Sequence, residues 1–299
     1  MTAFDLVARP EGAPPRDQLG EAPFWSEAEQ VLYWVDIAGR RAHRLDPATG
    51  EGRSWAMASS CSGIIPSVAG DAIVALRDGL HRLDLDSGAT TPFAQPDPDP
   101  GNRSNDCRTD PQGRIWLGTM CNNLGPDGEP RPLTRSSGCV YCVGADGTWT
   151  RLLSGIGITN SLAFSPDGTR FYCADTLKDV IWSFAYQPEG PTLSDRRVFV
   201  EGGAGHPDGS AMDEEGCLWS ARWGGGRVIR FTPDGRVDRE LMVPVAQPSN
   251  CAFGGPDRRS LFVTTARQEL EGLAPDSLDG SVFVAQVDVA GLPMTPFAG

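Results

Sequence analysis

A unit of sequence recurs along the chain, and this repetition limits the possible folds more than any other feature. Each copy has an acidic turn followed by an apolar, strand-like run with an aromatic residue, as in residues 110–119. Equivalent positions in six copies are spaced by 40, 43, 56, 46 and 43 residues; they are Asp36, Leu76, Thr119, Asp175, Ala221 and Thr264. A period of about 40 to 45 residues with several short strands is typical of a β-propeller blade.

The sequence therefore predicts an all-β fold, a six-bladed β-propeller with four-stranded antiparallel blades around a central channel. We expect residues 1–299 to form one such domain. The 36 glycines and 25 prolines separate short strand-like runs, and no long helical periodicity is present. The longest interval contains residues 121–137, which lack a strand pattern and are expected to form an inserted loop on the channel face. Residues 4–8 are expected to supply the strand that closes the ring.

The charge balance limits the possible partners. With 26 basic and 39 acidic residues the net charge is −13, which argues against nucleic acid and anionic membrane surfaces. No signal-peptide pattern opens the chain, and no apolar run approaches the ~18 residues of a membrane helix. Eight scattered cysteines are no disulfide framework, so we expect buried, reduced thiols in a cytoplasmic protein. The oligomeric state is left open.

Oxygen-bearing side chains recur near the start of the predicted innermost strands. They are Glu21, Asn105, Asn160, Asp208 and Asn250. Carboxylate and amide oxygens that meet in one channel would form a site for a divalent cation, with calcium, zinc, manganese, magnesium and iron(II) not distinguished. The alternative is that aspartate and asparagine stand there because they favour turns. The three histidines lie in different repeats, which argues against a histidine-rich zinc site.

Asp208 is the predicted working carboxylate of a metal-assisted hydrolase. It stands where a glycine-rich loop becomes a strand, and the following Gly209 allows another group to approach closely. A turn aspartate that bonds to its own backbone is the alternative. His206 is either a proton shuttle for Asp208 or a surface histidine of the loop. Arg222, at a blade end, is expected to be solvated.

Four motifs carry a resemblance to a known family. They are LGEAP at 19–23, NRSND at 102–106, ITNSLAFSPDG at 158–168 and PDGS at 207–210. Together with the repeats they make the sequence similar to the regucalcin–gluconolactonase family of six-bladed propellers, from residue 19 to about residue 267.

The resemblance implies that Glu21, Asn160 and Asp208 hold one divalent metal ion and that Arg103 and Asn105 contact the substrate. Asp106 matches a family position near the metal. The implied reaction is metal-dependent hydrolysis of a sugar (aldonic acid) lactone to the open-chain aldonate, in which the metal polarises the carbonyl and Asp208 assists the attacking water.

Two departures from the family leave the substrate open. Cys107 stands where the family usually has glycine or alanine, and the 121–137 loop is specific to this chain. The sugar and the ring size are therefore not predicted, nor are the roles of His206, Asp106 and Asn250. A propeller esterase or phosphotriesterase, and a non-catalytic calcium- or sugar-binding protein, are the alternative functions.

Overall fold

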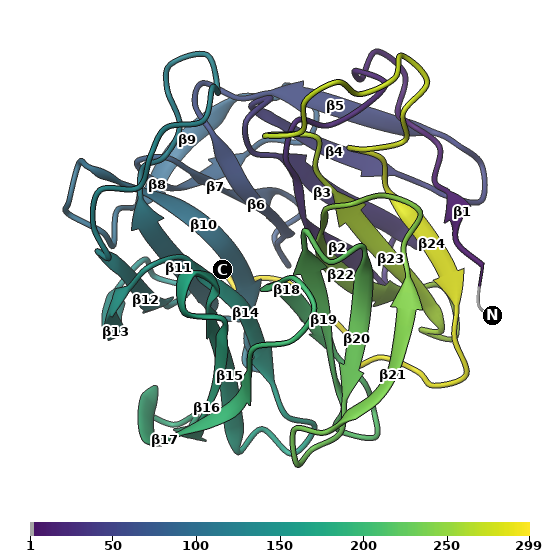
Figure 1. Cartoon of the computed structure of the whole chain (residues 1–299). Helices are drawn as coiled ribbons and strands as arrows, with labels where there is room; N and C mark the ends of the chain where they lie inside the picture. Colours follow the sequence, from purple (N-terminus) through teal and green to yellow (C-terminus); the bar gives the residue numbers. More distant parts are fainter. Residues whose placement is uncertain (1–2) are drawn as a thin grey trace.

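The computed structural model describes residues 3–299 as six four-stranded antiparallel sheets arranged around a common axis (Figure 1). The prediction of an all-β, six-bladed propeller is confirmed. One 3-10 helix, η1 (Thr176–Lys178), is the only helix within residues 3–299.

Each blade begins at the axis and ends at the rim. The inner strands are β2 (Gly20–Ser26), β6 (Cys61–Pro66), β10 (Asn102–Thr109), β14 (Thr159–Phe164), β18 (His206–Met212) and β22 (Pro248–Gly254). The second strands are β3 (Val31–Asp36), β7 (Ala72–Leu76), β11 (Ile115–Cys121), β15 (Arg170–Asp175), β19 (Leu218–Trp223) and β23 (Ser260–Thr265). All six equivalent positions of the sequence repeat lie in these second strands, so the predicted phase of the repeat is confirmed.

The outer half of each blade completes the sheets. The third strands are β4 (Arg41–Leu45), β8 (Gly79–Leu83), β12 (Gly138–Val143), β16 (Val180–Gln187), β20 (Arg227–Phe231) and β24 (Phe283–Gln286). The outer strands are β5 (Gly52–Ala56), β9 (Thr90–Ala94), β13 (Trp149–Ile156), β17 (Thr192–Glu201), β21 (Val237–Met242) and β1 (Asp5–Leu6). Burial falls from centre to rim: β2 and β3 are buried throughout, whereas β17 is exposed at most positions.

The ring is closed by strands from both ends of the chain. β1 pairs antiparallel with β24, and Asp5 lies opposite Val284 (Figure 1). The predicted closing strand is confirmed, although it is only two residues long. At the axis, β22 of the last blade contacts β2 of the first. The two chain ends therefore share one sheet, which opposes separation of the first and last blades.

In two blades a buried hydrogen bond joins the aspartate of the acidic turn to the tryptophan of the following strand. The indole of Trp116 donates to Asp110 Oδ2 at 3.0 Å, and that of Trp219 donates to Asp213 Oδ2 at 2.8 Å. Trp116 also packs into the next blade, with its ring centroid 4.4 Å from that of Phe171. A buried tryptophan needs an acceptor for its N–H, which explains why the two residue types recur together.

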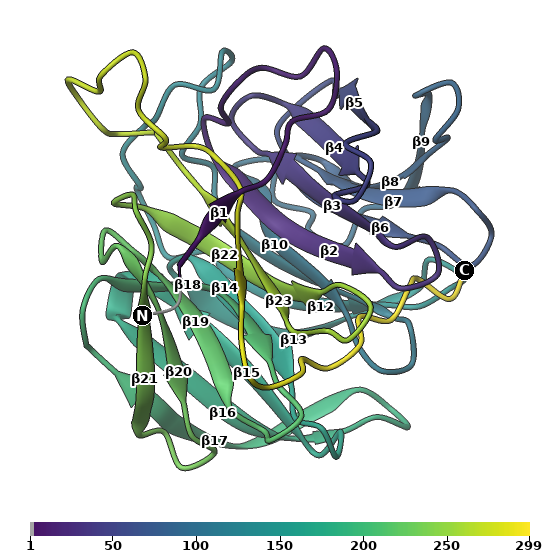
Figure 2. The ribbon, with the colours of Figure 1, turned by 90° about the vertical axis from the view of Figure 1, so that its right-hand side faces the viewer.

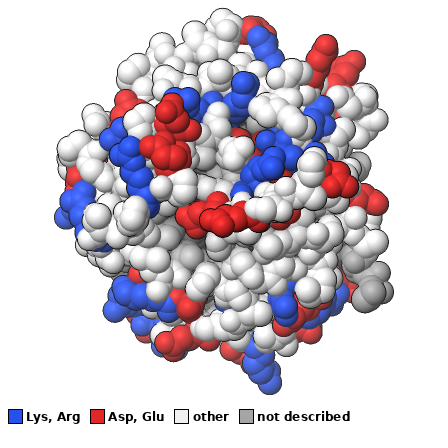
Figure 3. All heavy atoms as spheres, turned by 45° about the horizontal axis from the view of Figure 1, so that its top comes forward, with Lys and Arg blue, Asp and Glu red and all other residues white. Residues whose placement is uncertain are grey.

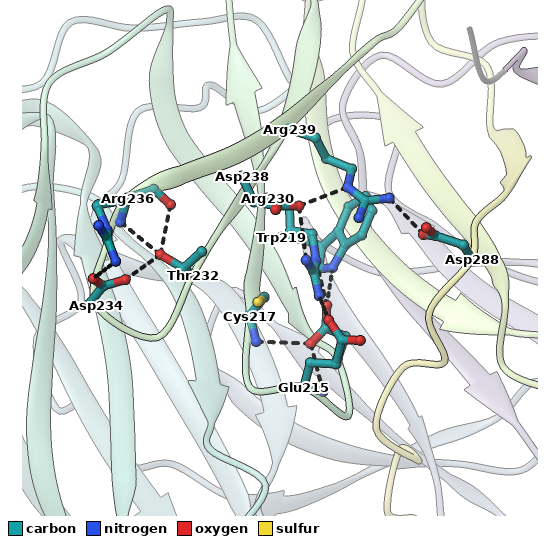
Figure 4. Close-up of polar contacts among 11 residues, drawn as sticks. Glu215, Cys217, Trp219, Arg230, Thr232, Asp234, Arg236, Asp238, Arg239 and Asp288 are labelled. Atoms are coloured by element: carbon teal, nitrogen blue, oxygen red, sulfur yellow. Dashed lines mark hydrogen bonds and ion pairs between the residues drawn. The ribbon is translucent and has the colours of Figure 1, made fainter.

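In the fifth blade this hydrogen bond belongs to a larger polar network (Figure 4). Arg230 donates to Asp213, Glu215 and Asp238 at 2.8, 2.6 and 2.9 Å, and its guanidinium lies over the Trp219 ring. Arg230 and Asp213 are both buried, so each needs the other as a partner.

The C-terminal segment covers one end of the ring. Its backbone N–H groups at Leu292 and Phe297 donate to Met212 O and Pro66 O, which are at the last residues of β18 and β6. Figure 2 shows this segment in yellow, running from the last blade to the C-terminus. A ligand therefore has its access at the opposite end, where the inner strands begin.

The cysteines, the surface charges and the lengths of helices bear on the expectations drawn from composition. All eight cysteines are free and buried, as expected. Acidic and basic side chains are interspersed over the face seen in Figure 3 rather than gathered in one basic patch. No helix within residues 3–299 has the length and apolar character needed to cross a membrane.

We expect Asp213→Ala to lower the free energy of unfolding by about 3 kcal/mol, because it leaves Arg230 and the Trp219 indole as buried donors without their acceptor. Urea denaturation followed by tryptophan fluorescence measures this. The matched control is Asp234→Ala in the exposed turn of the same blade (Figure 4), which should unfold at the wild-type midpoint. Equal midpoints for the two variants would contradict the structural role of the buried pair.

Candidate functional site

A cavity of about 400 Å³ opens at the end of the ring where the inner strands begin. Its wall contains all five residues for which the sequence predicts contact with metal or substrate, namely Glu21, Arg103, Asn105, Asn160 and Asp208. They come from four inner strands, β2, β10, β14 and β18. The structure thus brings these residues together, and their individual roles stay predictions.

A register shift on the inner strands gives these side chains their direction. The pairing with the second strand is interrupted between Glu21 and Phe24, between Asn160 and Ala163, and between Pro207 and Ser210. Such a bulge lets a strand turn a side chain away from the regular alternation. Ala22 and Ser161, directly after two of the candidate ligands, have φ values of 47° and 57°. Simple alternation along the sequence does not predict this geometry.

Glu21 and Asp208 are two buried carboxylates close to one another. Burial, with the nearby Asp106 charge, raises the pKa of Glu21 well above its usual range. Burial, and then the charge of Glu21, raises the pKa of Asp208 in the same way. Neither carboxylate has an ion pair with lysine or arginine in the described part of the chain. The site therefore lacks a directly bonded positive charge from the protein.

The amide of Asn160 is oriented by its neighbours. The Thr176 hydroxyl donates its only hydrogen to Pro207 O at 2.7 Å, so it can only accept from Asn160 Nδ2, 2.8 Å away. The Asn160 oxygen must then face the other way, where it accepts from Asn105 Nδ2 at 3.0 Å. The second lone pair of the Asn160 oxygen remains available, and its direction is set by these hydrogen bonds. A metal ligand needs such an oriented oxygen.

Asn250 supports Glu21 from the neighbouring blade. Its Nδ2 donates to Glu21 Oε2 at 2.9 Å, and its Oδ1 accepts from Cys251 N at 2.8 Å. A Cβ on Gly209 would lie only 1.8 Å from the Asn250 side-chain carbon. The glycine after Asp208 is therefore required by the space that Asn250 occupies. Asn250 is not in the cavity wall, so the structure gives it a supporting position behind Glu21.

Arg103 is a buried cation held in a fixed plane. Its Nε and Nη2 donate to Asn123 Oδ1 at 3.0 and 2.8 Å, and its Nη1 donates to Asn105 Oδ1 at 2.8 Å. Burial lowers the pKa of Arg103 to about 10, so it keeps its charge at neutral pH. Asn123 is not among the predicted site residues, and the only signal for it was the expectation that the 121–137 loop lies on the channel face.

Asp106 and His206 take different positions around the cavity. The Asp106 oxygens accept from Cys107 N at 2.8 Å and from Leu162 N at 3.2 Å, so both are bonded to backbone outside the cavity wall. His206 lines the cavity but is exposed, and its Nδ1 lies 2.5 Å from Asp179 Oδ1. His206 and Asp208 thus both reach the cavity wall, and the role of His206 stays open between a proton shuttle and a surface histidine.

The expected solvation of Arg222 is wrong. Its side chain is fully buried and donates to the carbonyls of Gly202, Ala204 and Gly205 at 2.9, 3.1 and 2.8 Å. The glycine-rich loop before β18 wraps around this guanidinium. Arg222 therefore holds the segment that leads into Asp208, and no local pattern in the sequence indicates this long-range contact.

The donor set of the cavity fits a divalent cation. Two carboxylates without a directly bonded lysine or arginine and one directed amide oxygen are ligands that hard or borderline divalent ions accept. Within residues 3–299, no group of three or more His, Cys, Asp and Glu side chains is arranged to hold a metal. A metal in this cavity would therefore need the Asn160 oxygen in addition to Glu21 and Asp208.

Comparison with known proteins gives consistent matches over nearly the whole chain. A family model described as "SMP-30/Gluconolactonase/LRE-like region" matches residues 19–267. A 6-deoxy-6-sulfogluconolactonase of Pseudomonas putida is 38% identical over 288 residues, covering 94% of this chain and 95% of the relative. An L-arabinolactonase of Azospirillum brasilense is 37% identical over 295 residues, covering 96% and 94%. A solved regucalcin of Agrobacterium tumefaciens, described as a calcium-binding protein, has a TM-score of 0.86 and 31% identity, covering 98% and 99%.

We expect Gly209→Ala to destabilise the protein by about 1–3 kcal/mol, because the new Cβ must displace Asn250. Asn250→Ala removes the obstructing side chain, so the double variant should be more stable than the sum of the single effects predicts, by about 1 kcal/mol. Chemical denaturation of the four proteins measures this coupling. Gly190→Ala, where a Cβ meets nothing within 4 Å, is the control. Additive effects of the two changes would contradict the contact.

Proposed function

Because the chain belongs to the SMP-30/gluconolactonase/LRE-like family, as its motifs predicted, we propose that it hydrolyses a sugar lactone to the open-chain aldonate. The observation that carries this proposal is that Glu21 and Asp208, buried and without a direct ion pair to lysine or arginine, meet Asn160 and Arg103 in one cavity. Two relatives named as lactonases support the reaction class. Their names give different sugars, so the proposal is made for sugar lactones as a class.

The proposal places one divalent cation between Glu21, Asn160 and Asp208. When bound, it would act as a Lewis acid that polarises the lactone carbonyl and stabilises the negative charge on its oxygen. The similar solved structure described as a calcium-binding protein supports a divalent ion. Calcium, zinc, manganese, magnesium and iron(II) all suit oxygen donors of this kind.

In the proposed reaction Asp208 is the catalytic residue that moves the proton. Its carboxylate accepts a proton from a water molecule as the water oxygen bonds to the carbonyl carbon. The ring C–O bond then breaks, and the proton passes from Asp208 to the departing ring oxygen. The net reaction adds one water molecule to the lactone and gives the open-chain hydroxy acid.

Arg103 and Asn105 have the proposed role of substrate positioning. The Arg103 guanidinium is fixed by Asn123 and Asn105, so little conformational entropy is lost when it binds hydroxyl or carbonyl oxygens of the sugar. Asn105 is itself bonded to Asn160 and to Thr159 O. It therefore links the substrate-binding side of the cavity to the proposed metal side. Apolar residues complete the wall and limit access of bulk water; they include Met120, Leu133, Ile158 and Trp223.

We expect Asp208→Asn to lower kcat by about a hundredfold or more, because an amide cannot accept the proton from water. Asp208→Ala should lose both turnover and metal. Lactone hydrolysis in a pH-stat and metal content by mass spectrometry measure the two effects separately. Asp234→Asn, an exposed aspartate far from the cavity, is the control. An Asp208→Asn protein that binds metal and keeps the wild-type rate would exclude Asp208 as the base and leave the lactonase function standing.

We expect chelation of the purified protein to abolish turnover of aldono-1,4- and aldono-1,5-lactones and re-addition of one of the candidate ions to restore it. The reason is that the proposed cation would polarise the lactone carbonyl, and that without it burial favours the protonated form of Asp208, which cannot accept a proton from water. A panel of the five candidate ions identifies the best metal. Full activity in metal-free protein would rule out metal dependence.

A further inference from the structure

A second cavity, of about 250 Å³, adjoins the central one. The two share Ile37 and Arg131 in their walls. Arg40, Arg77 and Arg131 all line the second cavity, which we call the arginine pocket, and no aspartate or glutamate is among its lining residues. The chain has 39 acidic against 26 basic residues. A cavity lined by three arginines and no carboxylate therefore differs from what the acidic composition of the chain leads one to expect.

Two of the three guanidinium groups are exposed and bond to backbone carbonyl oxygens. Arg40 Nη1 donates to Pro126 O at 3.1 Å, and Arg77 Nη2 donates to Pro100 O at 3.3 Å. Neither has an ion pair with a carboxylate among the residues that the structure describes. Arg131 is paired with Glu129 at 3.0 Å, and both side chains are exposed. Like charges that face one hollow repel one another, and an anion between them would remove that repulsion.

The arginine pocket is built by the 121–137 loop against the first two blades. The loop contributes Asn122, Leu124 and Arg131 among the lining residues. Gly128 packs so closely on the first blade that a Cβ there would lie 2.3 Å from Ala38 O. The wall is therefore fixed by main-chain packing. Ser60 adds a hydroxyl group that can donate to an oxyanion.

We infer that the arginine pocket binds an oxyanion substituent of the substrate, a carboxylate, phosphate or sulfonate carried on the lactone. This inference rests on the proposed lactonase function. The lactone ring would lie at Arg103 and Asp208, and its substituent would reach past Ile37 and Arg131. Planar guanidinium groups bind such oxyanions through paired hydrogen bonds, which a hydroxymethyl group cannot match. The preferred substrate is thus an anionic sugar lactone.

The test compares two lactones of the same ring that differ in charge, D-glucono-1,4-lactone and D-glucaro-1,4-lactone, with 6-phospho-D-glucono-1,5-lactone as a second anionic probe. We expect the wild type to prefer an anionic lactone in kcat/KM by about tenfold or more, with the preference falling as salt increases. In the double variant Arg40→Gln/Arg77→Gln this ratio should fall by about tenfold. Arg236→Gln, an exposed arginine of the fifth blade, should leave the ratio unchanged.

The outcomes distinguish failure of the anion-binding inference from failure of the proposed lactonase function. Equal kcat/KM for neutral and anionic lactones, or a ratio that the double variant does not change, overturns this inference and leaves the lactonase proposal standing. Wild-type turnover of none of the lactones overturns the proposed function and the inference with it. Free sulfate that speeds hydrolysis of the neutral lactone through Arg40 and Arg77 would identify a site for a separate anion and contradict the substrate assignment. A wild-type melting temperature for the double variant confirms that it is folded.

Discussion

The repulsion between Glu21 and Asp208 is the interaction on which the candidate site depends. Two buried carboxylates close to one another are unfavourable unless a proton or a cation compensates them. The protein does not relieve this repulsion with a directly paired lysine or arginine; it places Arg103 nearby and bonds it to amides instead. The same electrostatic cost makes the site a place where a divalent cation gains much by binding.

The propeller supplies the rigidity that this arrangement needs. Each candidate ligand comes from a different blade, so their separation is set by the packing of whole sheets rather than by one flexible loop. Buried pairs such as Asp213 with Trp219 stabilise the individual blades, and the C-terminal segment covers the far end of the ring. Around the ligands, Asn250 and Thr176 fix side-chain directions through hydrogen bonds. The cavity is thus formed largely in advance of ligand binding.

The sequence predicted the features that repeat or that follow from local pattern. Spacings of 40 to 56 residues between equivalent positions identified the blades, and oxygen-bearing residues near the starts of the inner strands indicated a cation site. The family resemblance then implied which of these residues are the ligands. Features that depend on contacts between distant segments were not predictable. The register shift beside Asn160, the contact of Gly209 with Asn250 and the burial of Arg222 arise only once neighbouring strands pair and pack. Asn123 and Arg131 lie in a loop without periodicity, so no pattern could place them.

The central claim is that Glu21, Asn160 and Asp208 share one divalent cation. The most direct measurement is anomalous X-ray scattering from crystals of the protein reconstituted with manganese. The account predicts one strong peak at about 2.0–2.6 Å from a carboxylate oxygen of Glu21, Oδ1 of Asn160 and a carboxylate oxygen of Asp208. A peak elsewhere, or an empty cavity in crystals of active protein, would contradict it.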